Sequence, residues 1–298
     1  TGDASYYDYV EKALYNTVIA GINIAGDRYF YVNPLEVVPE FCTEHTYMEH
    51  VKPVRQKWFG VACCPPNVGR TLASLGQYIY AEDEYGVYIN QFISSTADTE
   101  VRESRLKIKM NSTLLQDGKV QIEVQSSGPG NLNIRIPWYS GKCECVQNGI
   151  SIEIQPEKGY QRLSISPGDT YISLDFHVSP RWMGANNGVR ADAGKAALMK
   201  GPLVYCLEEK ENGRYLSEIF IEENTSIEET APAEELVGNV PTLSYKGIRV
   251  RNKGAAGENQ LYGNVELEKE EVSLQAVPYC MWNNRGEGEM LVWHKLRV

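Results

Sequence analysis

Six short segments in the middle of the chain alternate polar and apolar side chains, and this pattern constrains the fold more than any other feature. Successive side chains of a strand point to opposite faces, so such alternation is typical of strands with one buried face. Turn residues (Gly, Pro, Asn and Asp) separate the segments, and regularly spaced short strands of this kind predict an antiparallel β-sandwich. The segments are 87–93, 106–110, 120–124, 132–136, 161–165 and 171–176.

The spacing of apolar residues is different in the parts of the chain before and after these segments. Residues 3–19 carry apolar side chains at three- and four-residue spacing, which predicts an amphipathic helix. After residue 180, the apolar run 196–206 is interrupted by Gly201-Pro202, and 272–282 and 290–298 are expected to be closing strands. We therefore predict a mainly β chain in three parts, a helical part over 1–82 and two β-sandwich domains over 83–180 and 181–298.

The stretch 58–80, WFGVACCPPNVGRTLASLGQYIY, concentrates the reactive side chains. Pro65 and Pro66 disfavour helical geometry in the residues before them, so the helix is expected to begin after Cys64, with Asn67 as its cap. Thiols just before a helix N-terminus are favoured as thiolates. Cys63 and Cys64 are therefore candidates for a metal site or a nucleophile. Burial as small core residues is the alternative, and a redox-active pair is disfavoured because adjacent cysteines form strained disulfides.

Other candidate residues have weaker local support. Glu11 lies on the first predicted helix, where most glutamates face water. Tyr31 belongs to a predicted strand, 28–32, and is compatible with either a sugar pocket or the core. The spacing of Cys42, His45 and His50 resembles part of a zinc site, but a second cysteine pair is missing and a surface loop is preferred. The Cys143-x-Cys145 pair is interpreted as structural.

Composition excludes several classes of function. The formal net charge is −10, but ten glutamates against two basic residues fall within 208–235, which predicts a solvated acidic loop. No basic stripe supports nucleic-acid binding, and no apolar run is long enough to span a membrane. Seven cysteines are an odd number for a secreted disulfide framework, and no signal peptide is visible at the start. We expect a cytoplasmic protein, or a periplasmic one if a missing N-terminus carries a signal.

Four blocks, in order, resemble glycoside hydrolase family 127, the β-L-arabinofuranosidase family. The most specific is the Cys-Cys-Pro block at 58–80, and the others are EKALYNTVIAGI at 11–22, RADAGKAALMKGPLVYCLE at 190–208 and VPYCMWNNRGEGEMLVW at 277–293. The resemblance implies the end of an (α/α)6 barrel followed by two antiparallel β-sandwich domains. It also implies retaining hydrolysis of β-L-arabinofuranosides, with an L-arabinose-containing oligosaccharide or glycan as substrate.

The resemblance also implies roles for individual residues. Cys63 would be a zinc-bound nucleophile, Cys64 a second zinc ligand, Glu11 an active-site glutamate and Tyr31 a sugar contact. The family's acid/base glutamate and a Glu-x-Cys pair of zinc ligands lie upstream of the 11–22 block, where this chain has no sequence. We therefore expect a missing N-terminal part of the same enzyme to supply them, and the chain alone to be inactive.

Two further expectations remain open from the sequence. A homodimer is compatible with it. A non-catalytic carbohydrate-binding or scaffolding module, with structural cysteines, is the competing hypothesis to the glycosidase.

Overall fold

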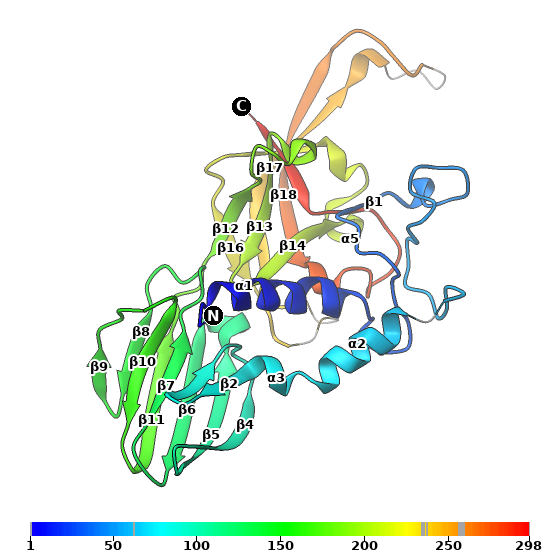
Figure 1. Cartoon of the computed structure of the whole chain (residues 1–298). Coiled ribbons are helices and arrows are strands. Elements are labelled where there is room, and N and C mark those ends of the chain that lie inside the picture. Colours follow the sequence, from blue (N-terminus) through cyan, green and yellow to red (C-terminus); the bar gives the residue numbers. More distant parts are fainter. Residues whose placement is uncertain (1, 62, 234–235, 237, 256–259, 298) are drawn as a thin grey trace. The chain divides into compact units, whose positions relative to one another are not determined.

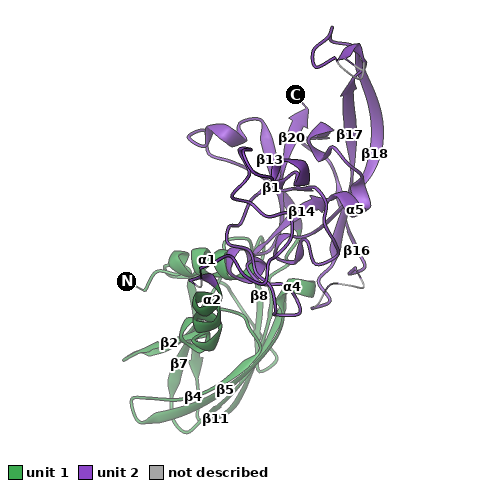
Figure 2. Ribbon diagram, turned by 90° about the vertical axis from the view of Figure 1, so that its right-hand side faces the viewer, with its two compact units in different colours: residues 1–15, 65–179 green, residues 16–64, 180–298 purple. Residues whose placement is uncertain are grey.

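The computed structural model describes residues 2–61, 63–233, 236, 238–255 and 260–297. It consists of two compact units (Figure 2): unit 1 contains 1–15 and 65–179, and unit 2 contains 16–64 and 180–298. The mainly β fold with a short helical N-terminal end is confirmed. The predicted helical part, 1–82, is divided between the two units. Its two ends belong to unit 1, and its middle belongs to unit 2.

Unit 1 is built on two sheets (Figure 1). The two sheets share one apolar core. The larger sheet is antiparallel and has the order β4 (Ser95–Val101), β5 (Ser104–Thr113), β6 (Lys119–Ser126), β11 (Gly168–Asp175), β8 (Glu144–Gln147) and β9 (Ile150–Ile152). The smaller sheet has the order β10 (Tyr160–Ile165), β7 (Gly130–Arg135), β3 (Gly86–Ile89) and β2 (Tyr80–Asp83), with α4 (Leu114–Asp117) between β5 and β6. All six predicted strands are present, although β3 and β7 pair in parallel.

The first helix has the predicted extent but buries a different face. It comprises α1 (Ser5–Lys12) and a π-helical continuation, η1 (Ala13–Val18). The buried side chains of this helix are Glu11, Leu14 and Asn16, while Tyr6, one of the apolar residues at helical spacing, is 61% exposed. The charged side chain of Glu11 thus lies on the buried face of the helix, where the spacing of apolar residues predicted no charge.

The helix after the paired cysteines begins earlier than predicted. Helix α2 (Cys64–Ala73) includes Cys64 and both prolines, and Asn67 lies inside it rather than capping it. Proline is tolerated in the first helical turn, because the N–H groups there have no intrahelical acceptor. Helix α3 (Gly76–Ile79) follows, and its Ile79 is buried. No helix among the described residues is long and apolar enough to cross a membrane.

The strands of unit 2 form one sheet. Its members are β1 (Glu36–Val37), β12 (Pro180–Gly184), β13 (Lys195–Lys200), β14 (Leu203–Glu208), β15 (Ile219–Glu222), β16 (Ile227–Thr230), β17 (Thr242–Asn252), β18 (Leu267–Pro278), β19 (Met290–Leu291) and β20 (Trp293–Arg297). The order β14-β18-β17-β15-β20-β13 closes into a ring because β13 and β14 also pair across Gly201-Pro202. The apolar run at 196–206 is therefore a buried hairpin that turns at Gly201-Pro202. Short helices connect the strands: η2 (Pro39–Phe41), η3 (Arg190–Asp192), α5 (Glu209–Asn212), η4 (Leu216–Glu218), η5 (Lys253–Ala255) and η6 (Tyr279–Met281).

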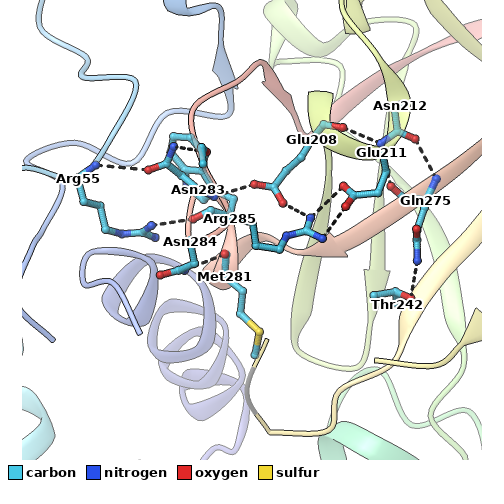
Figure 3. A network of polar contacts seen from close by, with 12 residues as sticks. Arg55, Glu208, Glu211, Asn212, Thr242, Gln275, Met281, Asn283, Asn284 and Arg285 are labelled. Atoms are coloured by element: carbon cyan, nitrogen blue, oxygen red, sulfur yellow. Dashed lines mark hydrogen bonds and ion pairs between the residues drawn. The ribbon is translucent and has the colours of Figure 1, made fainter. Parts of the chain in front are cut away.

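The acidic segment is largely structured, so the prediction of a solvated loop is wrong for its first half. Figure 3 shows Glu208 and Glu211 turned toward Arg285, whose side chain is 3% exposed. The Arg285 Nη1 donates to Glu211 Oε1 at 2.6 Å, and the Asn283 backbone N–H donates to Glu208 Oε1 at 2.7 Å. Negative charge that appears unbalanced in the sequence is neutralised here by an arginine more than seventy residues away. Residues 234–235, at the end of the segment, lie outside the described part.

Candidate functional site

Three of the four predicted site residues lie together in unit 2. The Sγ atom of Cys63 is 3.9 Å from the Sγ atom of Cys64 and 3.8 Å from the hydroxyl oxygen of Tyr31. Tyr31 is 46% exposed and Cys63 is also exposed, so this side of the cluster is open. Two thiols and a phenol hydroxyl, brought together over 32 residues of sequence, form a site at which a ligand can meet sulfur directly.

Aromatic packing holds this cluster in place. The Phe59 ring lies 5.0 Å from the Tyr29 ring and 5.8 Å from the Tyr31 ring, measured between centroids. The Tyr29 hydroxyl donates to the carbonyl of Val61 at 3.0 Å, close to the cysteines in the chain. The predicted strand 28–32 is absent. Tyr29 instead forms isolated bridges with Ile22 and Gln56, so hydrogen bonds to two separate segments replace a regular ladder.

A buried arginine fixes the segment 16–64 to the C-terminal part of unit 2. The Arg55 Nη1 donates to the carbonyl of Trp282 at 2.7 Å, and Nη2 donates to the carbonyl of Ala20 at 2.9 Å. Its backbone N–H donates to the side chain of Asn283 at 3.4 Å (Figure 3). The Phe30 ring stacks on Trp282 with centroids 4.7 Å apart. Local sequence analysis missed Arg55, because its partners are up to 228 positions away.

The spacing of the two sulfur atoms fits a shared zinc ion. Zinc–sulfur bonds of about 2.3 Å at a tetrahedral angle separate two sulfur ligands by about 3.8 Å. The observed separation is 3.9 Å. A structural zinc site usually needs four ligands, and no group of three or more His, Cys, Asp or Glu side chains in the described residues is arranged to hold a metal. The cysteines therefore fit two of four ligand positions.

The acid–base properties of the cluster differ from those inferred from the sequence. Burial and a hydrogen bond with Cys63 raise the pKa of the Cys64 thiol, which does not support the predicted stabilisation of a thiolate there. The same neighbour raises the pKa of Tyr31, first through a hydrogen bond and then through charge. Both shifts favour the protonated forms of Cys64 and Tyr31, because burial and a neighbouring negative charge each disfavour an anion.

Glu11, the fourth predicted site residue, lies in unit 1 and has a different environment. It has no exposed surface, and its Oε1 accepts a hydrogen bond from Arg135 Nη2 at 2.6 Å. Arg135 is also fully buried, and its Nη1 donates to Asp8 at 2.5 Å. Burial raises the pKa of Glu11, while the adjacent guanidinium acts in the opposite direction. A carboxylate enclosed in this way has no surface with which to touch a sugar.

The other cysteines are structural in the described residues. Cys42 is buried, and its thiol donates to the carbonyl of Val38 at 3.5 Å. Cys145 is buried within β8, and Cys143 packs against the core of unit 1. Burial raises the pKa of Cys143 to about 12 and that of Cys145 to about 11. Both thiols therefore remain protonated at neutral pH.

Three family descriptions match successive parts of the chain. They are the β-L-arabinofuranosidase GH127 catalytic domain over residues 1–77, the GH127 middle domain over 86–176 and the glycoside hydrolase family 127 C-terminal domain over 180–295. A protein described as a non-reducing end β-L-arabinofuranosidase, from Bifidobacterium longum subsp. longum, is 35% identical over 97% of this chain and 45% of its own length.

Solved structures agree with these matches. The structure of a GH127 β-L-arabinofuranosidase from Geobacillus stearothermophilus T6 superposes with a TM-score of 0.92 and 37% identity, over 100% of this chain and 47% of that one. The structure of a second GH127 β-arabinofuranosidase superposes with a TM-score of 0.86 and 27% identity, over 100% of this chain and 46% of that one. The fold and the matches correspond to the C-terminal half of glycoside hydrolase family 127 proteins. The chain belongs to glycoside hydrolase family 127, and it spans about half the length of the relatives that it matches.

Proposed function

We propose that the chain is the C-terminal half of a retaining glycoside hydrolase that releases β-L-arabinofuranose through Cys63. The observation that carries the proposal is the exposed Cys63 thiol beside Cys64 and the Tyr31 hydroxyl. Family membership and the names of the matched relatives support an arabinofuranoside substrate. The acid/base group is assigned to the part of the enzyme that lies outside the matched half.

In the proposed reaction, the Cys63 sulfur attacks the anomeric carbon while the glycosidic C–O bond breaks. The leaving oxygen takes a proton from the acid/base group. Water then attacks the same carbon, gives its proton to that group, and the C–S bond breaks, which regenerates the thiolate. Two displacements at one carbon retain its configuration. The Tyr31 hydroxyl lies 3.8 Å from the Cys63 sulfur, where it can donate a hydrogen bond to the thiolate and contact the sugar.

Cys63 and Cys64 are proposed to hold a zinc ion, with the remaining ligands supplied by the other half of the enzyme. Bound zinc would keep both thiols deprotonated at neutral pH. The 3.9 Å spacing of the sulfur atoms supports this assignment. Glu11 binds Arg135 and has no exposed surface, so we propose that it stabilises unit 1 rather than touching the substrate.

The test of this function is stereochemical. The full-length enzyme is incubated with 4-nitrophenyl β-L-arabinofuranoside, and the first-formed anomer of arabinose is followed by proton NMR. We expect the β-anomer first and no release from the α-linked substrate. Inversion of configuration, or the absence of release from the β-linked substrate, would contradict the proposal. A non-catalytic binding module gives the second of these results.

Replacement of Tyr31 by phenylalanine tests the role of its hydroxyl. We expect kcat/KM to fall roughly tenfold, which corresponds to the loss of one hydrogen bond worth about 1.4 kcal/mol in the transition state. The ring and its contact with Phe59 remain, so zinc content and thermal unfolding are expected to stay unchanged. Tyr47→Phe, which removes another exposed hydroxyl from the segment 16–64, is the matched control. Equal kcat/KM for both variants and the wild type would exclude the role.

A further inference from the structure

A hollow of about 680 Å³ lies on the outer face of the six-stranded sheet in unit 1. Strands β4, β5, β6 and β11 contribute its lining. Their alternate side chains fill the apolar core, so the hollow is lined by the other set. That set is largely polar, and the strand register arranges it in two neighbouring rows.

The first row runs across all four strands and contains complementary groups. Lys107 stands opposite Asp98 on one side and Gln125 on the other, and Gln125 stands opposite Asp169. Arg105 holds the Asp98 carboxylate through two hydrogen bonds of 2.7 Å each. The Gln125 amide donates to Asp169 at 3.4 Å. The Lys107 ammonium makes no hydrogen bond to another described residue, which leaves its donors available.

The second row, two residues further along the strands, ends in an aromatic ring. Lys109 stands opposite Glu123, and the two side chains form an ion pair of 3.5 Å. Glu123 stands opposite Tyr171 on β11. The Tyr171 side chain is 60% exposed and borders the hollow. The exposed ring of Tyr171 therefore lies beside carboxylate, amide and ammonium groups on the same face of the sheet.

The charge and chemistry of this surface select a class of ligand. Acidic and basic side chains are interleaved in both rows, so the surface presents no single sign of charge to attract a polyanion or a polycation. A neutral polyhydroxylated chain matches it, because each hydroxyl can donate to a carboxylate and accept from an ammonium or amide group. The apolar C–H face of a sugar ring can stack on an exposed tyrosine.

We propose that this outer-face hollow binds a neutral, arabinose-containing polysaccharide and so holds the glycan from which the enzyme removes terminal sugars. The inference rests on the proposed function for the identity of the glycan. The hollow belongs to unit 1, whereas the thiols belong to unit 2, so binding there and hydrolysis can be measured separately.

The test compares a polymeric and a small substrate on the full-length enzyme. We expect Tyr171→Ala and Lys107→Ala to weaken binding to arabinan about tenfold in affinity electrophoresis, and to raise KM to a similar degree for a polysaccharide that carries terminal β-L-arabinofuranose. Activity on 4-nitrophenyl β-L-arabinofuranoside is expected to stay at the wild-type level. Tyr215→Ala, at a similarly exposed tyrosine of unit 2, is the matched control and is expected to bind arabinan normally.

Two results would overturn the inference. One is wild-type affinity for arabinan in both variants. The other is an equal loss of binding in the Tyr215 control, since this would indicate a nonspecific effect of losing an exposed ring. A failure of the proposed function is distinct, because it shows as a lack of arabinose release from the small substrate by the wild-type enzyme.

Discussion

Replacement of Cys63 by serine is expected to lower kcat/KM for a β-L-arabinofuranoside by about 10³-fold or more in the full-length enzyme. A serine hydroxyl is not deprotonated at neutral pH and is a far weaker nucleophile than a thiolate. Loss of a nucleophile removes most of the catalytic advantage in other hydrolases that form covalent intermediates. The measurement is the initial rate of arabinose release, together with the zinc content of each purified variant.

Two comparisons separate the nucleophile from the ligand. Cys64→Ser is expected to lower both zinc content and activity, whereas Cys143→Ser, at a thiol packed against the core of unit 1, is expected to change neither. A brief reaction with an activated substrate is expected to leave one sugar on the tryptic peptide 58–70, and fragmentation locates it on Cys63. Wild-type activity in Cys63→Ser, or a sugar found on Cys64, would contradict the assignment.

Replacement of Arg135 by methionine is expected to destabilise unit 1 by about 3–5 kcal/mol, because it leaves buried carboxylate without its cation. Arg135 is fully buried and binds both Glu11 and Asp8, with donor–acceptor distances of 2.6 and 2.5 Å. Its Nε also donates to the carbonyl of Asn90 at 2.6 Å. Urea unfolding of the 298-residue chain, followed by circular dichroism, is the measurement.

The control for Arg135→Met is an exposed ion pair of the same unit. Lys142→Met removes the cation from an ion pair with Glu144 whose side chains are largely in water, so the unfolding midpoint is expected to change little. The double variant Arg135→Met with Glu11→Gln is expected to be more stable than Arg135→Met alone, because it removes the unpaired charge. If Arg135→Met had the same urea unfolding midpoint as the wild type, the buried ion pair would contribute nothing to stability.

Residue pattern alone predicted much of the β architecture, because strand alternation is a local property. The six predicted strands of unit 1 are all present, and the hairpin β13–β14 lies where an apolar run is interrupted by Gly201-Pro202. Several strands escaped prediction, among them the long β17 (Thr242–Asn252) of unit 2. Strand β4, STADTEV, is another, because it lies at a sheet edge and its side chains remain partly in water.

The sequence by itself determined the family, the mainly β composition and the identity of the paired thiols, since each of these depends on residues that are close together in the chain. Tertiary structure decided which polar groups are buried and what neutralises them. Arg135 encloses Glu11 from 124 positions away, and Arg285 neutralises Glu208 from 77 positions away. Desolvation makes an unpaired buried charge costly, so the role of each charge depends on a partner that only the folded chain brings near. The contact between Tyr31 and Cys63 and the burial of Glu11 likewise depend on residues that only the folded chain brings together.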